Sequence, residues 1–334
     1  MTTRLLLLVV PFIVIAAMVA YDTRSQADEV QNPTSPKTDN PVEVGHVRWG
    51  RDLDAALQLS ADTGKPVFVL FQEVPGCQGC QDFGQSVLTE PLLVEAIEDE
   101  FIPVLVINNR LGQDRQTLKR FNEPAWNYQV IRFLDADAND IIPRKDRVWT
   151  TPHLRSRMVA ALTAAERPVP QYLHTVAAEH NPGLQTAAFA MFCFWVGEAD
   201  LGALPGVIST EAGWYDGKEV TRVLYDPNTI SLNILSQHAR TARCAATQTY
   251  TTNHNAPNQA GGLPVAALGP TYRPARTADQ SRQLIGYDTL TGLPGLTEMQ
   301  RTKLNALLRT DPPKALTWLS PRQFAILQQR INAQ

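Results

Sequence analysis

The sequence predicts an α/β protein of two domains with a helical C-terminal tail. Two continuous apolar runs of strand length, 66–71 and 102–107, have the pattern of strands that are buried on both faces. A helical pattern over 91–100 lies between them, and a C-x-x-C pair directly follows the first run. A further apolar run, 187–196, comes after a segment rich in proline and polar residues, and the 334-residue chain is long enough for two modest domains.

The other elements of the first domain, predicted over 45–165, follow from spacing and from helix start and stop signals. Leucine and alanine recur at helical spacing over 52–63, and a Gly-Lys-Pro stop ends that helix. Residues 130–134, the polar turn DADAND and residues 141–142 predict a hairpin. A Thr-Pro start predicts a helix over 151–165. The resulting order is β-α-β followed by β-β-α.

Beyond the first domain we expect a linker over 166–182 and a second domain over 185–290. The linker is predicted because proline and polar residues dominate it. The tail, 291–334, contains two amphipathic helical patterns, 296–308 and 321–331. We expect the apolar faces of these helices to pack on the body of the protein.

The N-terminal 27 residues have the features of a secretory signal peptide. Arg4 precedes an uncharged apolar run, 5–21, and the small-x-small site ending at Ala27 follows it. This run of 17 residues is at the short limit of what spans a bilayer, so an uncleaved N-terminal membrane anchor is the alternative. In both cases we expect a periplasmic or other extracytoplasmic location, with 28–44 as a polar linker.

Composition argues against several classes of function. The net charge is −3 and no run of Lys and Arg forms a basic stripe, so nucleic acid is not an expected partner. The four cysteines, at positions 77, 80, 193 and 244, are too few for a disulfide scaffold and include one close pair, whereas a zinc ribbon needs two. We therefore expect no metal and no cofactor, and thiol redox chemistry is the favoured interpretation.

Cys77 and Cys80 are the first candidate catalytic residues. Their spacing at a helix start brings both sulfurs within disulfide reach, and the first amide groups of the helix stabilise a thiolate on Cys77. Cys77 is therefore the predicted nucleophile, and Cys80 is the predicted resolving thiol. The alternative is a structural disulfide, but so short a loop gains little chain entropy.

The segment VFVLFQEVPGCQGCQDFG resembles the strand-turn-helix that carries the active dithiol in the thioredoxin family. The resemblance extends over roughly 45–165 and implies a thioredoxin fold. Pro75-Gly76 stands where the family usually has a Trp before the first cysteine. The resemblance also implies a cis-proline that faces the dithiol and binds substrate, and Pro124 is the candidate for it.

The second apolar run, AAFAMFCFWV, carries Cys193 into the start of a helix, and a series of short motifs follows it in order. These motifs are LPGV, ST, GW and E-V-x-x-V-x-Y-D-P-x-x-I-S. The series resembles peptide methionine-S-sulfoxide reductase of the A type. This resemblance implies an α+β domain and a fusion of a sulfoxide reductase to its thiol reductant.

The family resemblance implies a role for several residues of the second domain. Cys193 would attack the sulfoxide sulfur as a thiolate. Phe194 and Trp195 would hold the methyl group of the substrate, with Trp214 in place of a family Tyr near the sulfoxide. Glu219 would protonate the departing oxygen as a carboxylic acid of raised pKa.

Cys244 is the implied partner that converts a sulfenic acid on Cys193 to a disulfide, which Cys77 would then reduce. The sequence departs from the family at Met191-Phe192, where the family usually has Gly-Gly. An ordinary buried cysteine on an apolar strand is therefore the alternative for Cys193.

The predicted function is that of an exported thiol-dependent oxidoreductase that reduces methionine S-sulfoxide, or a related sulfoxide, with electrons from the fused dithiol. The expected partners are oxidised proteins, carrying methionine sulfoxide or disulfides, and a membrane thiol-reductant donor. One alternative is a thiol-disulfide oxidoreductase with a catalytically degenerate second domain. Another is a non-enzymatic envelope scaffold that binds client proteins through an apolar groove.

Overall fold

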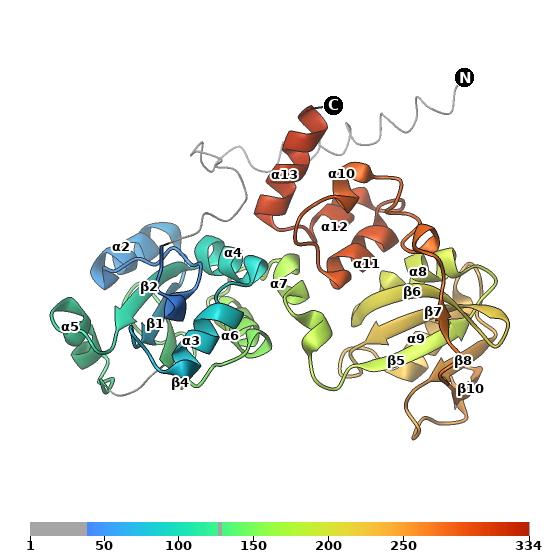
Figure 1. The fold of residues 1–334 in the computed structure, drawn as a ribbon, viewed down its shortest axis with the longest axis horizontal. Coiled ribbons are helices and arrows are strands. Elements are labelled where there is room, and N and C mark those ends of the chain that lie inside the picture. The colour runs from blue at the N-terminus through green and yellow to red at the C-terminus, as the bar shows by residue number, and fades with distance from the viewer. Residues whose placement is uncertain (1–38, 126–128, 334) are drawn as a thin grey trace. The chain divides into compact units, whose positions relative to one another are not determined.

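A computed structural model describes residues 39–125 and 129–333 as two compact units (Figure 1). The first unit ends at His180 and the second begins at Asn181. The predicted signal peptide, 1–27, lies outside the described residues. Within the described ranges, no helix is both long and apolar enough to span a bilayer.

The first unit contains a four-stranded sheet in the order β2-β1-β3-β4. The strands β1 (Val67–Gln72) and β2 (Ile102–Ile107) run parallel, and β3 (Gln129–Leu134) runs antiparallel to β1. The fourth strand, β4 (Lys145–Asp146), pairs with β3 at the edge. The predicted α/β class is confirmed.

The predicted hairpin of 130–134 with 141–142 forms next to its turn, where Leu134 bridges Asp140, but the pairing is interrupted after Ile141. The backbone N–H of Ile141 donates to the Phe133 carbonyl at 2.8 Å, but the strand that pairs with β3 begins at Lys145. Pro143 lies between them, and a proline has no N–H with which to continue a ladder.

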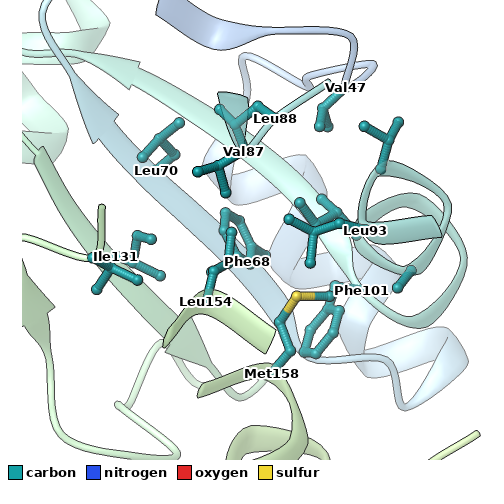
Figure 2. Packing of buried hydrophobic residues seen from close by; sticks show 14 of the residues in the cluster. Val47, Phe68, Leu70, Val87, Leu88, Leu93, Phe101, Ile131, Leu154 and Met158 are labelled. Carbon is teal, nitrogen blue, oxygen red and sulfur yellow. The ribbon is translucent and has the colours of Figure 1, made fainter. Parts of the chain in front are cut away.

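The β1 strand is buried on both faces, as its continuous apolar run predicts. Phe68 and Leu70 point into one core, and Val67 and Val69 point into the other. The first core is covered by α3 (Gln78–Ser86), α4 (Pro91–Glu100) and α6 (Thr151–Ala164), and the second by α2 (Leu53–Thr63) and α5 (Gln113–Arg120). Figure 2 shows the first core, where Phe68 and Leu70 lie among Ile131, Leu154 and Met158.

The segment predicted as a linker, 166–182, belongs largely to the core of the first unit. The short helix α7 (Gln171–Thr175) buries Tyr172 and Leu173 almost completely, and Val176 joins the same core. Because proline and polar residues dominate the segment, its few apolar side chains did not predict a helix in the core. The first domain therefore extends to His180 and does not end at 165.

The second unit contains a seven-stranded sheet in the order β11-β6-β7-β5-β8-β10-β9. Its central strands are β5 (Gln185–Ala190), β7 (Lys218–Tyr225) and β8 (Gln248–Thr251), and β6 (Val207–Tyr215) forms a hairpin with β7. The short outer strands are β9 (Gln259–Ala260), β10 (Leu263–Ala267) and β11 (Arg273–Pro274). The helices α8 (Phe194–Gly202) and α9 (Leu232–Thr241) complete an α+β arrangement.

Four helices of the described C-terminal region, from residue 288 onward, have a common core of their own. They are α10 (Asp288–Thr291), α11 (Glu298–Leu307), α12 (Pro312–Leu316) and α13 (Pro321–Asn332). The tail also packs on the body of the second unit, because α11 lies against α8 and β6. The ammonium of Lys303 donates to the carbonyls of Gly202 and Leu204, each at 2.7 Å, at the C-terminal end of α8.

The core position of α7 gives a direct test of the first domain boundary. Tyr172 is 1% exposed, so Tyr172→Ala should lower the free energy of unfolding of the first unit by about 3–5 kcal/mol. Gln171→Ala, on the exposed side of the same helix, should change it by less than about 0.5 kcal/mol. Hydrogen exchange of peptides that cover β1 measures both changes. Equal effects of the two substitutions would mean that 166–182 is a linker.

Candidate active sites

The dithiol lies where a buried strand passes into a helix. Cys77 is the N-cap of α3, and Cys80 lies in the first turn of that helix. Their sulfur atoms are 3.5 Å apart, and both cysteines are reduced. Cys77 is exposed and Cys80 is completely buried. Burial raises the pKa of Cys80 to about 12, and the hydrogen bond and charge of Cys77 add to this shift. Cys80 is thus kept as a thiol while Cys77 faces solvent.

A buried carboxylate beside the dithiol was not found by sequence reasoning. The 3₁₀ turn η1 (Val42–Val44) carries Glu43, which is 3% exposed and whose Oε1 accepts a hydrogen bond from the Gly76 amide at 2.8 Å. The amide nitrogen of the Gln72 side chain donates to the carbonyls of Glu43 and Cys80, at 3.0 and 3.3 Å. The end of the predicted linker, 28–44, is therefore part of the site.

Two further side chains shape the dithiol loop. Asn109 follows β2, and its side chain accepts from the Val74 amide and donates to the Pro75 carbonyl, both at 3.2 Å. Trp149 packs edge-on against Phe83 of α3, with ring centroids 6.0 Å apart. Neither residue belongs to a motif, so the sequence offered no signal for them.

The assignment of Pro124 as a cis-proline is wrong. The cis peptide bond of the described residues joins Val74 to Pro75, and the bond before Pro124 is trans. Pro124 follows the end of α5, where Asn122 has a φ of 52° and the Glu123 amide bonds to the Leu118 carbonyl. Pro124 therefore belongs to the exit from that helix, several residues before β3 begins.

The second candidate site has the same local design as the first. Cys193 follows β5 and is the N-cap of α8, in extended backbone geometry with φ −149° and ψ 106°. Its carbonyl accepts from the Gly197 amide at 3.1 Å, which closes the first turn of the helix. The side chain is partly exposed. The bulky neighbours Met191 and Phe192 do not seal it, because Met191 is in the core and Phe192 is 86% exposed.

Glu219 reaches the start of α8 from the neighbouring hairpin. Its Oε2 accepts a hydrogen bond from the Phe194 amide at 3.1 Å, which places the carboxylate next to Cys193. The carbonyl of Glu219 also accepts from the Met191 amide at 3.1 Å. Across the hairpin, Glu219 pairs with Trp214. The acid is thus bound at the start of the helix that Cys193 caps, and its cross-strand neighbour is aromatic.

The three aromatic residues predicted to bind substrate lie together. The ring of Phe194 is 5.7 Å from that of Trp195 and 5.6 Å from that of Trp214. Phe194 is 5% exposed and Trp214 is 39% exposed. The cluster is an apolar surface that is partly open to solvent beside Cys193 and Glu219.

Cys244 lies in the loop after α9, and folding brings it from 51 positions away into contact with Cys193. Burial, the charge of Cys193 and a hydrogen bond between the two thiols raise the pKa of Cys244. The structure therefore unites three groups that the sequence only lists in order: a thiol at a helix start, a carboxylate and a second thiol.

Glu198 is a further buried acid near this site that no motif indicated. It lies on α8 with no exposed surface, and it accepts hydrogen bonds from the Ser281 amide at 3.1 and 3.3 Å. Burial raises the pKa of Glu198 to about 8. Sequence reasoning could have noted it as an isolated charge in an apolar helical segment.

The contrast between Cys77 and Cys80 predicts their alkylation behaviour. Between about pH 6 and 9, iodoacetamide should label Cys77 and leave Cys80 unreacted, because only the thiolate reacts and Cys80 is protonated in this range. In Cys77→Ser, Cys80 should react faster than in the parent protein, since Cys77 no longer raises its pKa. Peptide mass spectrometry measures both rates. Faster labelling of Cys80 than of Cys77 in the parent would reverse the assignment of the nucleophile.

Comparisons with known proteins agree with this two-part description. A thioredoxin-like family model matches residues 48–136. The chain is 40% identical over 86 residues to peptide methionine sulfoxide reductase MsrA of Cronobacter sakazakii (strain ATCC BAA-894), a match that covers 20% of this chain and 41% of that relative. The match thus spans about two fifths of the relative's length.

A solved structure titled DsbH Oxidoreductase is also similar. It matches with a TM-score of 0.30 and 15% sequence identity, covering 42% of this chain and 96% of that chain. The family model and the MsrA relative by themselves confirm the predicted resemblances: the chain combines a thioredoxin-like part with a part similar to peptide methionine sulfoxide reductase.

Proposed function

We propose that the chain is a thiol-dependent oxidoreductase that reduces methionine S-sulfoxide, or a related sulfoxide, at Cys193. The observation that carries this proposal is the convergence of Cys193, Glu219 and Cys244 on one end of α8. An inert buried cysteine would need neither a partly exposed thiol nor a carboxylate and a second thiol beside it. The similarity to a methionine sulfoxide reductase supports the choice of substrate.

The first step forms a sulfenic acid. The thiolate of Cys193 attacks the sulfoxide sulfur, the S–O bond breaks, and the oxygen passes to Cys193 as Cys–SOH while the substrate leaves as a thioether. The departing oxygen needs a proton, and the Glu219 carboxyl can supply it. Oε2 of Glu219 already accepts from the Phe194 amide, so Oε1 is the oxygen that can carry the acidic hydrogen.

The aromatic residues provide the apolar side of the substrate site. Methionine sulfoxide carries a methyl group, and the transfer of this group from water to a hydrocarbon surface is favourable. Phe194 and Trp214 offer such a surface next to the thiol, with ring centroids 5.6 Å apart. Trp214 is partly exposed and sits at the open side of the cluster.

The remaining steps return the site to its reduced form. The thiol of Cys244 displaces water from the sulfenic acid, which forms a disulfide with Cys193. Cys77 then attacks this disulfide, and Cys80 resolves the mixed disulfide and closes the dithiol. The exposure of Cys77 and the burial of Cys80 support this division of labour. Because both sites are in one chain, the reductant is always present at a high effective concentration.

We also propose that the protein is exported and works in the periplasm or another extracytoplasmic space. The support is the sequence of residues 1–27, with one basic residue, an apolar run and a small-x-small site. In such a compartment, a membrane thiol-reductant donor would be needed to reopen the disulfide between Cys77 and Cys80.

Single-turnover and multiple-turnover assays separate the roles of the cysteines. With free methionine S-sulfoxide, Cys193→Ser should abolish even the first reduction event. In an assay without added thiol, where only the Cys77/Cys80 dithiol can act as reductant, Cys77→Ser and Cys244→Ser should each give one equivalent of methionine and then stop. The measurement is methionine formed per protein chain. Full sulfoxide reduction by Cys193→Ser would remove Cys193 from the mechanism, and no sulfoxide reduction by the parent protein would leave a thiol-disulfide oxidoreductase alone.

The role of Glu219 has its own test in the same assay. Glu219→Gln should slow the first event by about two orders of magnitude or more, the usual effect of losing a general acid. Glu298→Gln, an equivalent change at an exposed glutamate of α11, is the matched control and should leave the rate unchanged. Equal rates for the two variants would remove Glu219 from the mechanism.

The export proposal predicts a mature chain that begins at Asp28. Mass spectrometry of the protein taken from its native envelope fraction measures this terminus. An intact N-terminal segment, 1–21, would instead indicate a membrane anchor.

A further inference from the structure

The loop that carries Cys244 is fixed to the catalytic helix by one ion pair. Arg243 directly precedes Cys244, and its backbone amide donates to Oδ2 of Asp200 at 3.1 Å. Its guanidinium donates to Oδ1 of Asp200 through two nitrogens, Nε at 3.0 Å and a terminal nitrogen at 2.6 Å. One carboxylate thus binds both the backbone and the side chain of the residue next to the second thiol.

Asp200 is in the right place on α8 to set the position of Cys244 relative to Cys193. It lies seven residues after Cys193, and positions i and i+7 share one face of a helix. The other end of the loop is held separately, since the Ala246 amide bonds to the Ala239 carbonyl and the Thr247 amide bonds to Ala190, both at 2.9 Å. Cys244 lies between these two attachments.

The pair acts through position more than through charge. Burial is the main cause of the raised pKa of Cys244; among the smaller contributions, Asp200 raises this pKa and Arg243 lowers it. Their effects on the thiol therefore oppose one another. The Arg243 side chain is 64% exposed, and exposed ion pairs contribute only about 0–1 kcal/mol to stability. Loss of the pair should therefore free the loop without unfolding the domain.

We propose that Asp200 and Arg243 are positioning residues for the resolving step, which hold the thiol of Cys244 beside Cys193. This inference rests on the proposed roles of Cys193 and Cys244. In the step concerned, the sulfur of Cys244 attacks the sulfenic sulfur of Cys193, the S–S bond forms and the S–O bond breaks. The oxygen leaves as water with the thiol proton, so Cys244 is oxidised and the sulfenic acid is reduced.

The test compares disulfide closure in Asp200→Ala, Arg243→Ala and the parent protein, all of them carrying Cys77→Ser so that the dithiol cannot reopen the disulfide. In a single turnover, the yield and rate of methionine formation should stay within about twofold, because neither residue contacts the reacting atoms. Formation of the Cys193–Cys244 disulfide should slow by about tenfold or more, since misplacement of a reacting group carries a cost of this order. Dimedone should accordingly trap more sulfenic acid on Cys193.

Three controls make the result specific. Arg240→Ala removes an exposed arginine of the same helix-loop segment and should leave closure unchanged. Arg243→Lys keeps the positive charge and the backbone bond to Asp200 and should restore part of the rate. The denaturation midpoint of each variant should match the parent, which excludes general unfolding. Closure at the parent rate in Asp200→Ala would overturn the proposal.

Stoichiometric hydrogen peroxide provides an arm that does not depend on sulfoxide reduction. Peroxide oxidises the Cys193 thiolate to the same sulfenic acid, so closure can be timed in every variant. One outcome would separate the two proposals. If the parent protein closes the disulfide rapidly with peroxide but reduces no sulfoxide, and Asp200→Ala closes it slowly, the positioning role is supported and the proposed activity is refuted. Failure of the parent that carries Cys77→Ser to form the disulfide with peroxide would overturn the positioning role itself.

Discussion

The hydrogen bond from the Phe194 amide to the Glu219 carboxylate is the contact on which the second site depends. It joins the first turn of α8, which carries Cys193, to the hairpin that carries the acid and Trp214. Amide groups at a helix start are left without partners inside the helix, so a carboxylate is well stabilised there. The same contact thus satisfies the helix and brings the acid to the thiol.

Close packing makes that contact possible. A β-carbon at Gly197 would lie 2.1 Å from Oγ1 of Thr221 and 2.6 Å from the sulfur of Met191, so only glycine lets α8 lie this close to β7. The first site uses the same device. A β-carbon at Gly84 would meet the Val42 carbonyl at 1.9 Å. Because glycine has no β-carbon, η1 can lie close to α3 and bring the buried carboxylate of Glu43 to the dithiol loop.

Both sites place a thiol at the junction of a central strand and a helix, but they differ in how the partner thiol is supplied. In the first unit the partner is in the first turn of the helix that Cys77 caps, so local geometry alone sets the sulfur separation of 3.5 Å. In the second unit the partner comes from a distant loop, and its position depends on Asp200, Arg243 and the packing of α9. Local geometry thus sets the first pair, and contacts between distant parts of the chain set the second.

The sequence by itself determined the elements whose signals are local. Continuous apolar runs predicted β1 and β2, caps and stops predicted α2 and α6, and the C-x-x-C spacing predicted the dithiol. Tertiary structure alone decided the inclusion of Glu43 and α7 in the first unit, the trans bond before Pro124, and the meeting of Cys193 with Cys244. These features depend on contacts between residues far apart in the chain, and short-range periodicity and capping carry no information about such contacts.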